Sequence, residues 1–210
     1  MNWREFLTNR RTELIITVLF LTVILFTFPN FLAFVEGRHG VTLADPILEL
    51  FNPIDLTWLT FGLIYISLII AIFSFAAKPE ILLLTLQSYS LLIIFRVMVM
   101  YSAPLDAPER LILLNDPFVQ FIGSGEALTK DLFFSGHTAT LFLLFLISDK
   151  KHLKIIFLMS TVLVGMAVLL QHVHYTIDVL AAPFFAYSSY KIVKIINVRL
   201  TFKKYVSDKN

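Results

Sequence analysis

The chain has 210 residues, of which 58% are hydrophobic and 15% are charged, and it contains no cysteine. This composition is too apolar for an ordinary soluble domain, and it excludes disulfides and thiolate metal sites. The net charge of +2 implies no nucleic-acid partner. We therefore expect an integral membrane protein, an all-α bundle that forms a single domain over residues 1–210.

Six apolar runs predict six transmembrane helices, over residues 14–35, 56–77, 80–101, 132–148, 153–171 and 174–198. A basic segment with Trp3 and Phe6 precedes the first run and is typical of an interfacial lead-in. A signal peptide is the alternative for this run. Its apolar core would be too long, and no small-residue cleavage site follows, so an uncleaved helix is favoured.

Two long loops separate the predicted helices. The first, residues 36–55, contains Asp45-Pro46, which predicts the N-cap and first residue of a short surface helix. Asn52-Pro53 ends that helix. The third loop, residues 102–130, is the longest and carries the acidic residues Asp106, Glu109, Asp116 and Glu126.

The basic residues predict the orientation of the chain in the membrane. The N-terminal end, the second and fourth loops and the C-terminal end from Lys191 carry 13 of the 17 lysines and arginines, whereas the first and third loops carry three. Cytoplasmic segments are enriched in lysine and arginine. We therefore expect both termini in the cytoplasm and the first, third and fifth loops outside.

This orientation places four ionisable residues at one depth, just under the outer surface of the membrane: Arg96, His137, His174 and Asp178. Each has an ordinary explanation when taken alone. The arginine can extend to the headgroups, either histidine can be a packing or interfacial residue, and the aspartate can cap the last helix. Ionisable groups in a membrane are costly, so their joint occurrence favours one polar site.

The spacing of His174 and Asp178 indicates an activated nucleophile. Residues four apart share a helix face, so the carboxylate can fix the imidazole tautomer and leave the other nitrogen free to attack. We expect His174 to attack a lipid phosphoester and form a phosphohistidine. Protonated His137 then donates to the departing alkoxide and later acts as base on the acceptor. This scheme needs no metal and no cofactor.

The residues around His137 predict a phosphate site. Ser135 and Gly136 precede it at a helix start, where free backbone N–H groups and a glycine favour a bound phosphate. Arg96 and Lys130 can neutralise the phosphate oxygens.

Two motifs around these residues resemble the type 2 phosphatidic acid phosphatase (PAP2) superfamily, and most closely its sphingomyelin-synthase-like branch. The branch carries Asp, three residues and Ser-Gly-His-Thr, then His-Tyr-Thr, one residue, Asp-Val, two residues and Ala. Residues 131–138 and 174–182 match these motifs, within a motif region of about 96–187. The resemblance implies six transmembrane helices, an exoplasmic active site and the triad His137, His174 and Asp178. The other polar motif positions, Asp131, Tyr175 and Thr176, would have supporting roles.

The sequence departs from these patterns in ways that bear on the substrate. Thr129-Lys130 replaces the branch's Cys-Gly, and Pro183 and Ala186 replace a tyrosine and a threonine. The phosphatase branch's Lys-to-Arg-Pro motif is missing because Val97 follows Arg96, and its Ser-Arg before the nucleophile is missing too. A phosphomonoester dianion needs several cations, so the reduced cation set favours transfer of a phosphodiester headgroup.

The expected partners are a phospholipid donor and a lipid-alcohol acceptor of the ceramide or diacylglycerol type, both within the bilayer. The acidic third loop suggests a cationic headgroup such as choline or ethanolamine, although a solvated loop is the alternative. Cation–π contacts can add to this preference. The aromatic candidates are Tyr101, Phe118, Phe121 and Tyr175.

Two other functions stay open. Water can replace the lipid acceptor, which would make the protein a PAP2-type lipid phosphatase. A non-catalytic haem or lipid carrier is the second, in which His137 with His172 or His174 would ligate the haem iron. That function gives Asp178 no role. The small size and the lack of an appended cytoplasmic domain favour a bacterial inner membrane.

Overall fold

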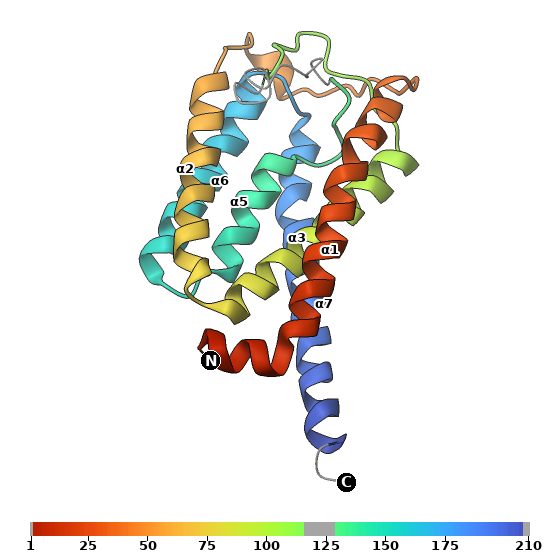
Figure 1. Ribbon diagram of the computed structural model, residues 1–210. Helices are drawn as coiled ribbons and strands as arrows, with labels where there is room; N and C mark the ends of the chain where they lie inside the picture. The colour runs from red at the N-terminus through yellow and green to blue at the C-terminus, as the bar shows by residue number, and fades with distance from the viewer. Residues whose placement is uncertain (1, 116–128, 208–210) are drawn as a thin grey trace.

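The computed structural model describes residues 2–115 and 129–207, with side chains up to residue 199, and these residues form a helical bundle (Figure 1). The helices are α1 (Trp3–Glu36), α2 (Thr57–Ala76), α3 (Pro79–Ser102), α5 (Gly136–Ile147), α6 (Lys151–Leu170) and α7 (Thr176–Ser207), with one 3₁₀ turn, η1 (Leu48–Leu50). Five of these helices, all except α5, are long and apolar enough to cross a membrane. The predicted polytopic all-α fold is confirmed.

The fourth predicted span is wrong in its length. Helix α5 begins at Gly136 and has twelve residues, so it is about 18 Å long, against a hydrocarbon core of about 30 Å. Residues 132–135 are not helical, and Phe133 has a φ of 88°, in a region that L residues rarely adopt. Helix α5 therefore begins inside the bundle, below the level at which α2 begins and α6 ends (Figure 1).

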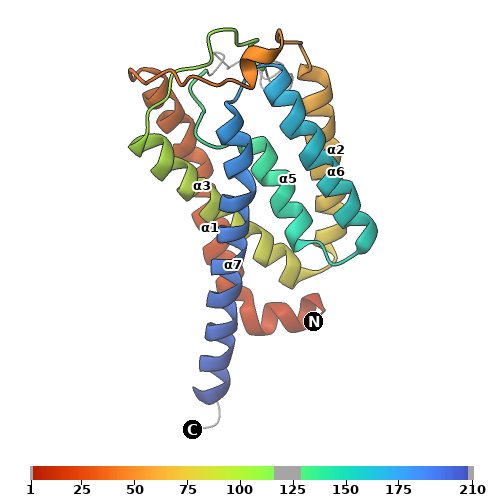
Figure 2. The ribbon, with the colours of Figure 1, turned by 180° about the vertical axis from the view of Figure 1, so that it is seen from behind.

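The last predicted span begins too early, whereas its end at residue 198 agrees with the candidate span Thr176–Arg199. Helix α7 begins at Thr176, so His174 lies in the turn that follows α6. Asp45 stabilises this start, because its carboxylate accepts hydrogen bonds from the Thr176 backbone N–H at 2.6 Å and from the Thr176 hydroxyl at 3.0 Å. At its other end α7 continues to Ser207 and extends beyond the rest of the bundle (Figure 2).

The N-terminal segment is a helix that bends away from the rest of α1. The backbone leaves helical geometry at Arg10 (φ −132°, ψ 18°), and the preceding residues lie across the end of the bundle (Figure 1). Phe6 is fully buried there, and the Trp3 indole N–H donates to the Ala76 carbonyl at 2.9 Å. This arrangement agrees with the expected interfacial lead-in.

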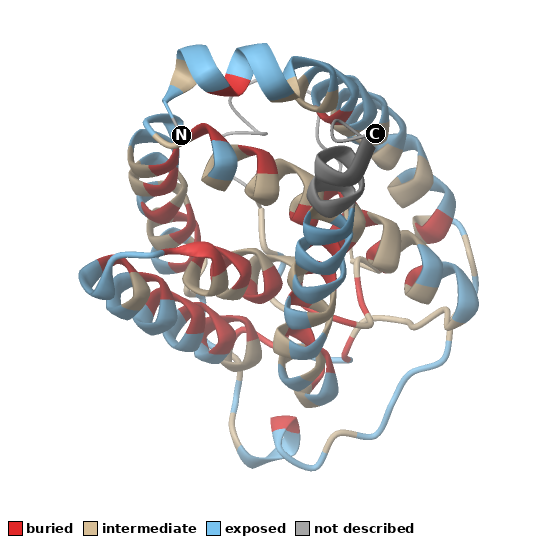
Figure 3. Ribbon diagram, turned by 90° about the horizontal axis from the view of Figure 1, so that it is seen from below, coloured by how far each residue is buried: buried red, intermediate tan, exposed pale blue. Residues whose placement is uncertain are grey.

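Helix α5 is the centre of the bundle, since it packs against α2, α3, α6 and α7. Its residues Ala139, Leu141 and Leu143 are at most 1% exposed. Gly165 lets α6 lie close to α7, because a Cβ at position 165 would be only 3.1 Å from the side chain of Val179. Buried residues face inward and exposed residues face outward around the bundle (Figure 3). Many of the exposed residues are large and apolar, as expected of a lipid-facing surface.

The ends of the helices opposite the two termini are joined by buried polar groups. Gln171 is fully buried, accepts a hydrogen bond from the Leu56 N–H at 3.1 Å and donates to the Thr57 hydroxyl at 2.9 Å. The carboxylate of Glu36 accepts from the backbone N–H groups of residues 129 and 130, each at 3.0 Å. These contacts fix the loops at the end of the bundle opposite the two termini (Figure 1).

The short surface helix predicted in the first loop is present as η1, but it begins at Leu48 with Ile47 at its N-cap, and not with Asp45 and Pro46 as predicted. Asp45 Oδ1 accepts hydrogen bonds from the N–H groups of Ile47 at 3.1 Å and Leu48 at 3.4 Å. Asp45 therefore holds both the turn that leads into η1 and the start of α7. Partial burial raises the pKa of its carboxyl, but the hydrogen bonds from Thr176, Leu48 and Ile47 outweigh burial, so that the pKa lies below its ordinary value of 3.8.

We predict that Asp45 makes folding stability fall in acid. A lowered pKa in the folded state adds stability above pH 3.8, and this is lost as the pH falls through the lowered value. Asp45→Asn should lower the free energy of unfolding by about 0.5–2 kcal/mol at pH 7. On further acidification, the stability of this variant should fall less than that of the wild type. Thermal unfolding in detergent between pH 7 and pH 3 measures both effects. Glu109→Gln, an exposed carboxylate of the third loop, is the control, and equal profiles for the two variants would contradict the prediction.

Candidate active site

His174 and Asp178 form a buried pair at the start of α7. The aspartate is fully buried and the histidine is 3% exposed. Asp178 Oδ2 lies 3.3 Å from His174 Nδ1 and accepts a hydrogen bond from the Tyr175 N–H at 3.2 Å. With the proton on Nδ1, the lone pair of Nε2 is free for attack. The two residues therefore meet as their spacing suggested, although His174 precedes the helix.

The starts of α5 and α7 are joined directly. The Ser135 N–H donates to the Asp178 carbonyl at 3.1 Å. The Ser135 hydroxyl oxygen caps α5 and accepts hydrogen bonds from the N–H and the hydroxyl of Thr138. Ser135 is fully buried as a result and does not line the cavity described below. Its place in the fold is that of a helix cap that brings the first turn of α5 to the His174–Asp178 pair.

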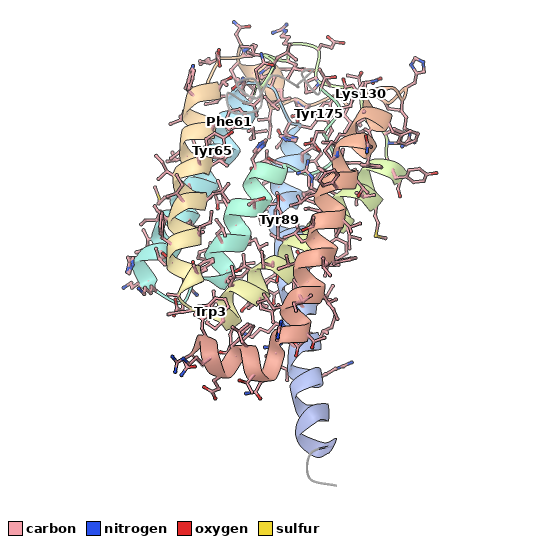
Figure 4. The ribbon with its side chains drawn as sticks, viewed as in Figure 1. Trp3, Phe61, Tyr65, Tyr89, Lys130 and Tyr175 are labelled. Atoms are coloured by element: carbon pink, nitrogen blue, oxygen red, sulfur yellow. The ribbon has the colours of Figure 1, made fainter. Side chains whose placement is uncertain are left out.

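His137 lies in the first turn of α5 and meets an aromatic wall. Its ring stands edge-on to Phe61 of α2, with 5.8 Å between ring centroids and an interplanar angle of 88°. Phe61 stacks in turn on Tyr65, and both lie in the upper half of α2 (Figure 4). The sequence did not single out Phe61, because one phenylalanine in an apolar helix gives no signal.

Arg96 is buried at the boundary between α3 and α5. It is 7% exposed, pairs with Asp131 through Nη2, and its Cζ lies 5.9 Å and 5.5 Å from the ring centres of Phe28 and Phe134. Its Nη1 lies where a Cβ of residue 136 would be, so any larger residue there would have to displace the guanidinium. Arg96 Nε is buried with no hydrogen-bond partner among the described residues. Such an unsatisfied donor costs about 1–3 kcal/mol, which favours an anion beside it.

A cavity of about 500 Å³ adjoins Arg96. Its walls are mostly apolar side chains of α1, α2, α3 and α5, and its most polar part is formed by Arg96, Asp131, Gly136 and His137. Tyr89 of α3, two helical turns from Arg96, is on the wall (Figure 4). The volume is within the range of ligand pockets. An apolar space with one charged end matches a lipid chain that carries a polar head.

Lys130 is held outside this cavity. Its ammonium pairs with Asp106 at 2.9 Å and donates to the Arg38 carbonyl at 2.5 Å. The hydrogen bond from Lys130 lowers the pKa of the Asp106 carboxyl. Lys130 lies near the outer end of α1 (Figure 4). Its role in phosphate binding stays a prediction, and this geometry adds no support for it.

The supporting motif residues hold the turn that carries His174. The Tyr175 hydroxyl donates to the Asp106 carbonyl at 2.9 Å and accepts from the Leu43 N–H at 3.2 Å. Burial raises the pKa of Tyr175, so this hydroxyl stays protonated. Together with the Thr176 contacts to Asp45, these bonds fix the turn to the first and third loops.

The aromatic and acidic residues suggested for a cationic headgroup are placed only in part. The Tyr101 ring is already covered by the Arg38 guanidinium, whose Cζ lies 5.3 Å from the ring centre. Phe118, Phe121, Asp116 and Glu126 lie outside the described residues.

Comparison with known families bears on this set of residues. Residues 130–198 match the family model described as PAP2 superfamily C-terminal. The match supports membership of the PAP2 superfamily. It spans both motifs, from Asp131 to Asp178, whereas Arg96 lies outside it. PAP2 proteins are in general lipid phosphatases or related phosphotransferases, and the match supports such an activity in general terms. No curated protein and no solved structure gives a match.

We predict that Gly136→Ala removes phosphate chemistry without unfolding the protein. The added methyl would overlap the Arg96 guanidinium and displace it from Asp131 and the cavity. Release or transfer of phosphate from a labelled lipid should fall at least tenfold, roughly 1.4 kcal/mol or more, with a small change in melting temperature.

The matched control is Gly62→Ala in α2. A Cβ at Gly62 meets nothing within 4 Å, and alanine favours a helix over glycine, so activity should be retained. Equal losses in both variants would show that the close approach of Arg96 to Gly136 is unimportant.

Proposed function

We propose that the protein is a membrane lipid phosphotransferase that moves a phospho-headgroup between lipids through a phosphohistidine, as in the sphingomyelin-synthase-like branch. The observation that carries the proposal is the apolar cavity that has His137 and the buried Arg96 at its charged end. A lipid whose chain fills the cavity brings its phosphate to the unpartnered Arg96 Nε–H. A fixed donor in a dry site favours the charge that develops on a phosphate under attack.

The local charge supports a phosphodiester as the substrate. Asp131 already offsets the charge of Arg96, and Lys130 is bound to Asp106. The charged end of the cavity therefore offers little net positive charge apart from protonated His137. A monoanionic phosphodiester is bound with fewer cations than a dianionic phosphomonoester, because each further negative charge needs its own partner when it leaves water.

The first half of the reaction cleaves the bond between the phosphate and the donor lipid. His174 Nε2 attacks phosphorus while Nδ1–H is held by Asp178 Oδ2, so that a P–N bond forms as the P–O bond to the donor lipid breaks. His137 transfers its proton to the departing alkoxide oxygen, which leaves as a neutral lipid alcohol. The Asp178 carboxylate stabilises the positive charge that the His174 ring acquires.

The second half releases the headgroup. Neutral His137 takes the proton of an acceptor hydroxyl, whose oxygen attacks phosphorus as the P–N bond breaks. The products are the new phospholipid, free His174 and protonated His137, which is ready for another cycle. A lipid alcohol of the ceramide or diacylglycerol type is the proposed acceptor, and water in its place gives the phosphatase reaction.

The charge distribution supports an outward-facing site. The loops that hold the site lie at the end of the bundle opposite both termini (Figure 1). The termini and the loops on their side carry most of the lysines and arginines. By the distribution of basic residues, the termini are cytoplasmic and the site faces the exoplasmic leaflet.

We predict that His174→Ala abolishes covalent labelling by a lipid labelled in its phosphate. His137→Gln should still become labelled by a substrate with an acidic leaving group, because such a group departs without a proton. With an ordinary lipid alcohol as leaving group, the same variant should lose at least a hundredfold in rate. The amount of acid-labile label on the wild-type protein measures the phosphohistidine. Full labelling of His174→Ala would exclude the scheme.

We predict that the products identify a transferase. Purified protein receives phosphatidylcholine or phosphatidylethanolamine labelled in the headgroup phosphate, with and without ceramide or diacylglycerol. A new labelled phospholipid that requires the added lipid alcohol is expected, measured by chromatography of the lipid fraction. Water-soluble phosphate or phospho-alcohol at the same rate in both reactions would make the protein a lipid phosphatase.

A further inference from the structure

A second pocket, of about 640 Å³, opens between the first outer loop and residues 108–110. None of its lining residues lines the lipid cavity. Unlike that cavity it lies among the loops, and its lining is rich in ionisable groups: Asp45, Glu49, Glu109, Arg110, His172 and Tyr175. The proposed transfer reaction uses none of these side chains as a reacting group.

His172 is the buried polar group of this pocket. It is 3% exposed, its backbone has a φ of 56°, and its ring stands edge-on to Phe51 with centroids 5.2 Å apart. The ring has a hydrogen bond to the Phe51 backbone, but its Nε2 is buried without a partner among the described residues. A polar atom left in this state is costly unless a ligand satisfies it.

The protonation state of His172 defines what Nε2 can bind. Burial, and the nearby charge of Arg110, lower the pKa of its imidazole, so the ring is neutral at pH 7. The bond to the Phe51 backbone raises this pKa, as expected when a ring N–H donates to a carbonyl. The remaining nitrogen, Nε2, is then a lone-pair acceptor and needs a donor.

The carboxylates of the pocket add negative charge to the lining that includes this acceptor. Glu49 and Glu109 are exposed and make no ion pair or hydrogen bond within the described part of the chain. Asp45 is occupied by Thr176 and η1. Arg110 is the one cation among the described residues of the lining and donates to Asn52 at 3.4 Å. The lining therefore has an excess of negative charge.

We propose that this pocket binds a small primary amine in its ammonium form. An ammonium group has three N–H donors, which can be shared between His172 Nε2 and the carboxylates of Glu49 and Glu109. A quaternary ammonium has no N–H donor and is held instead by several aromatic faces. Within the described part of the chain, Tyr175 is the one six-membered aromatic ring in this lining. The pocket therefore selects a primary amine over a trimethylammonium group, and it does so independently of the transfer reaction.

Calorimetric titration of the full chain in detergent at pH 7 tests the proposal with ethanolamine and choline as probes. Saturable binding of ethanolamine is expected, with choline at least tenfold weaker. The double substitution Glu49→Gln and Glu109→Gln should weaken ethanolamine binding at least tenfold. The matched control, Glu5→Gln with Glu80→Gln, makes the same change of net charge on exposed residues at the other end of the bundle and should bind as the wild type does.

His172→Asn tests the buried acceptor, since asparagine tolerates a positive φ better than most residues but lacks the imidazole. It should weaken ethanolamine binding at least tenfold with a retained melting temperature. His174→Ala should bind ethanolamine normally, which separates this pocket from the transfer reaction. No saturable binding, equal binding of choline, or normal binding by the Glu49 and Glu109 double variant would overturn the proposal.

The same probe identifies the natural source of the amine. In nanodiscs of phosphatidylethanolamine, a lipid headgroup that occupies the pocket would compete and weaken the binding of free ethanolamine, relative to nanodiscs of phosphatidylcholine. Competition identifies the bound amine as a lipid headgroup, and equal affinities in the two nanodiscs identify it as a water-soluble compound.

Discussion

The Asp178 side chain accepts contacts from the His174 ring and the Tyr175 amide, while its backbone carbonyl accepts the Ser135 amide. One fully buried residue thus joins the starts of α5 and α7 and orients the proposed nucleophile. A carboxylate withdrawn from water is stable only with partners in place, so the fold at this end and the geometry of His174 depend on the same contacts. The approach of Arg96 to Gly136 then adds α3 to the assembly.

The two cations expected at the phosphate pair with different carboxylates. Arg96 pairs with Asp131, and Lys130 pairs with Asp106. Arg96 lies within the helices, between two aromatic faces, and its ion pair with Asp131 borders the lipid cavity. Lys130 lies in the loop one residue before that aspartate and is drawn to Asp106 instead. The flexible Lys130 ammonium can pair with any nearby carboxylate and carbonyl, whereas the planar Arg96 guanidinium is held in place by contacts with aromatic rings. Two cations with one predicted role therefore occupy different surroundings.

The sequence was most informative where an ionisable residue stands within an apolar run, because such a residue is energetically costly in a membrane. The spacing of a histidine and an aspartate in an apolar run predicted the His174–Asp178 contact. The order of the apolar runs predicted the helices. Helix ends were predicted less well, because an apolar residue such as Leu132 looks the same in an extended segment and in a helix. The apolar run alone therefore placed the start of this helix at residue 132, whereas Ser135-Gly136, interpreted as a helix start, agrees with the observed start of α5 at Gly136.

The loop contacts could not be predicted. Asp45 meets Thr176, and Glu36 meets the N–H of residue 129, across 131 and 93 positions of sequence. Polar residues in loops are ordinarily solvated, so nothing in their local sequence indicates such partners. The local sequence explains Asp45 as a helix cap in the first loop, and this explanation gives no sign of its contact with α7.

The shortness of α5 has a consequence for how a lipid would reach the site. Because α5 begins below the level at which α2 begins and α6 ends (Figure 1), the proposed outward-facing site would hold a phosphate at Arg96 deeper than the headgroups of the surrounding leaflet. A bound lipid must sink relative to its neighbours, and the distance it sinks depends on where the bilayer surface lies around the protein. The thickness of the membrane then enters the free energy of substrate binding, in the same way that hydrophobic mismatch enters the stability of a single helix.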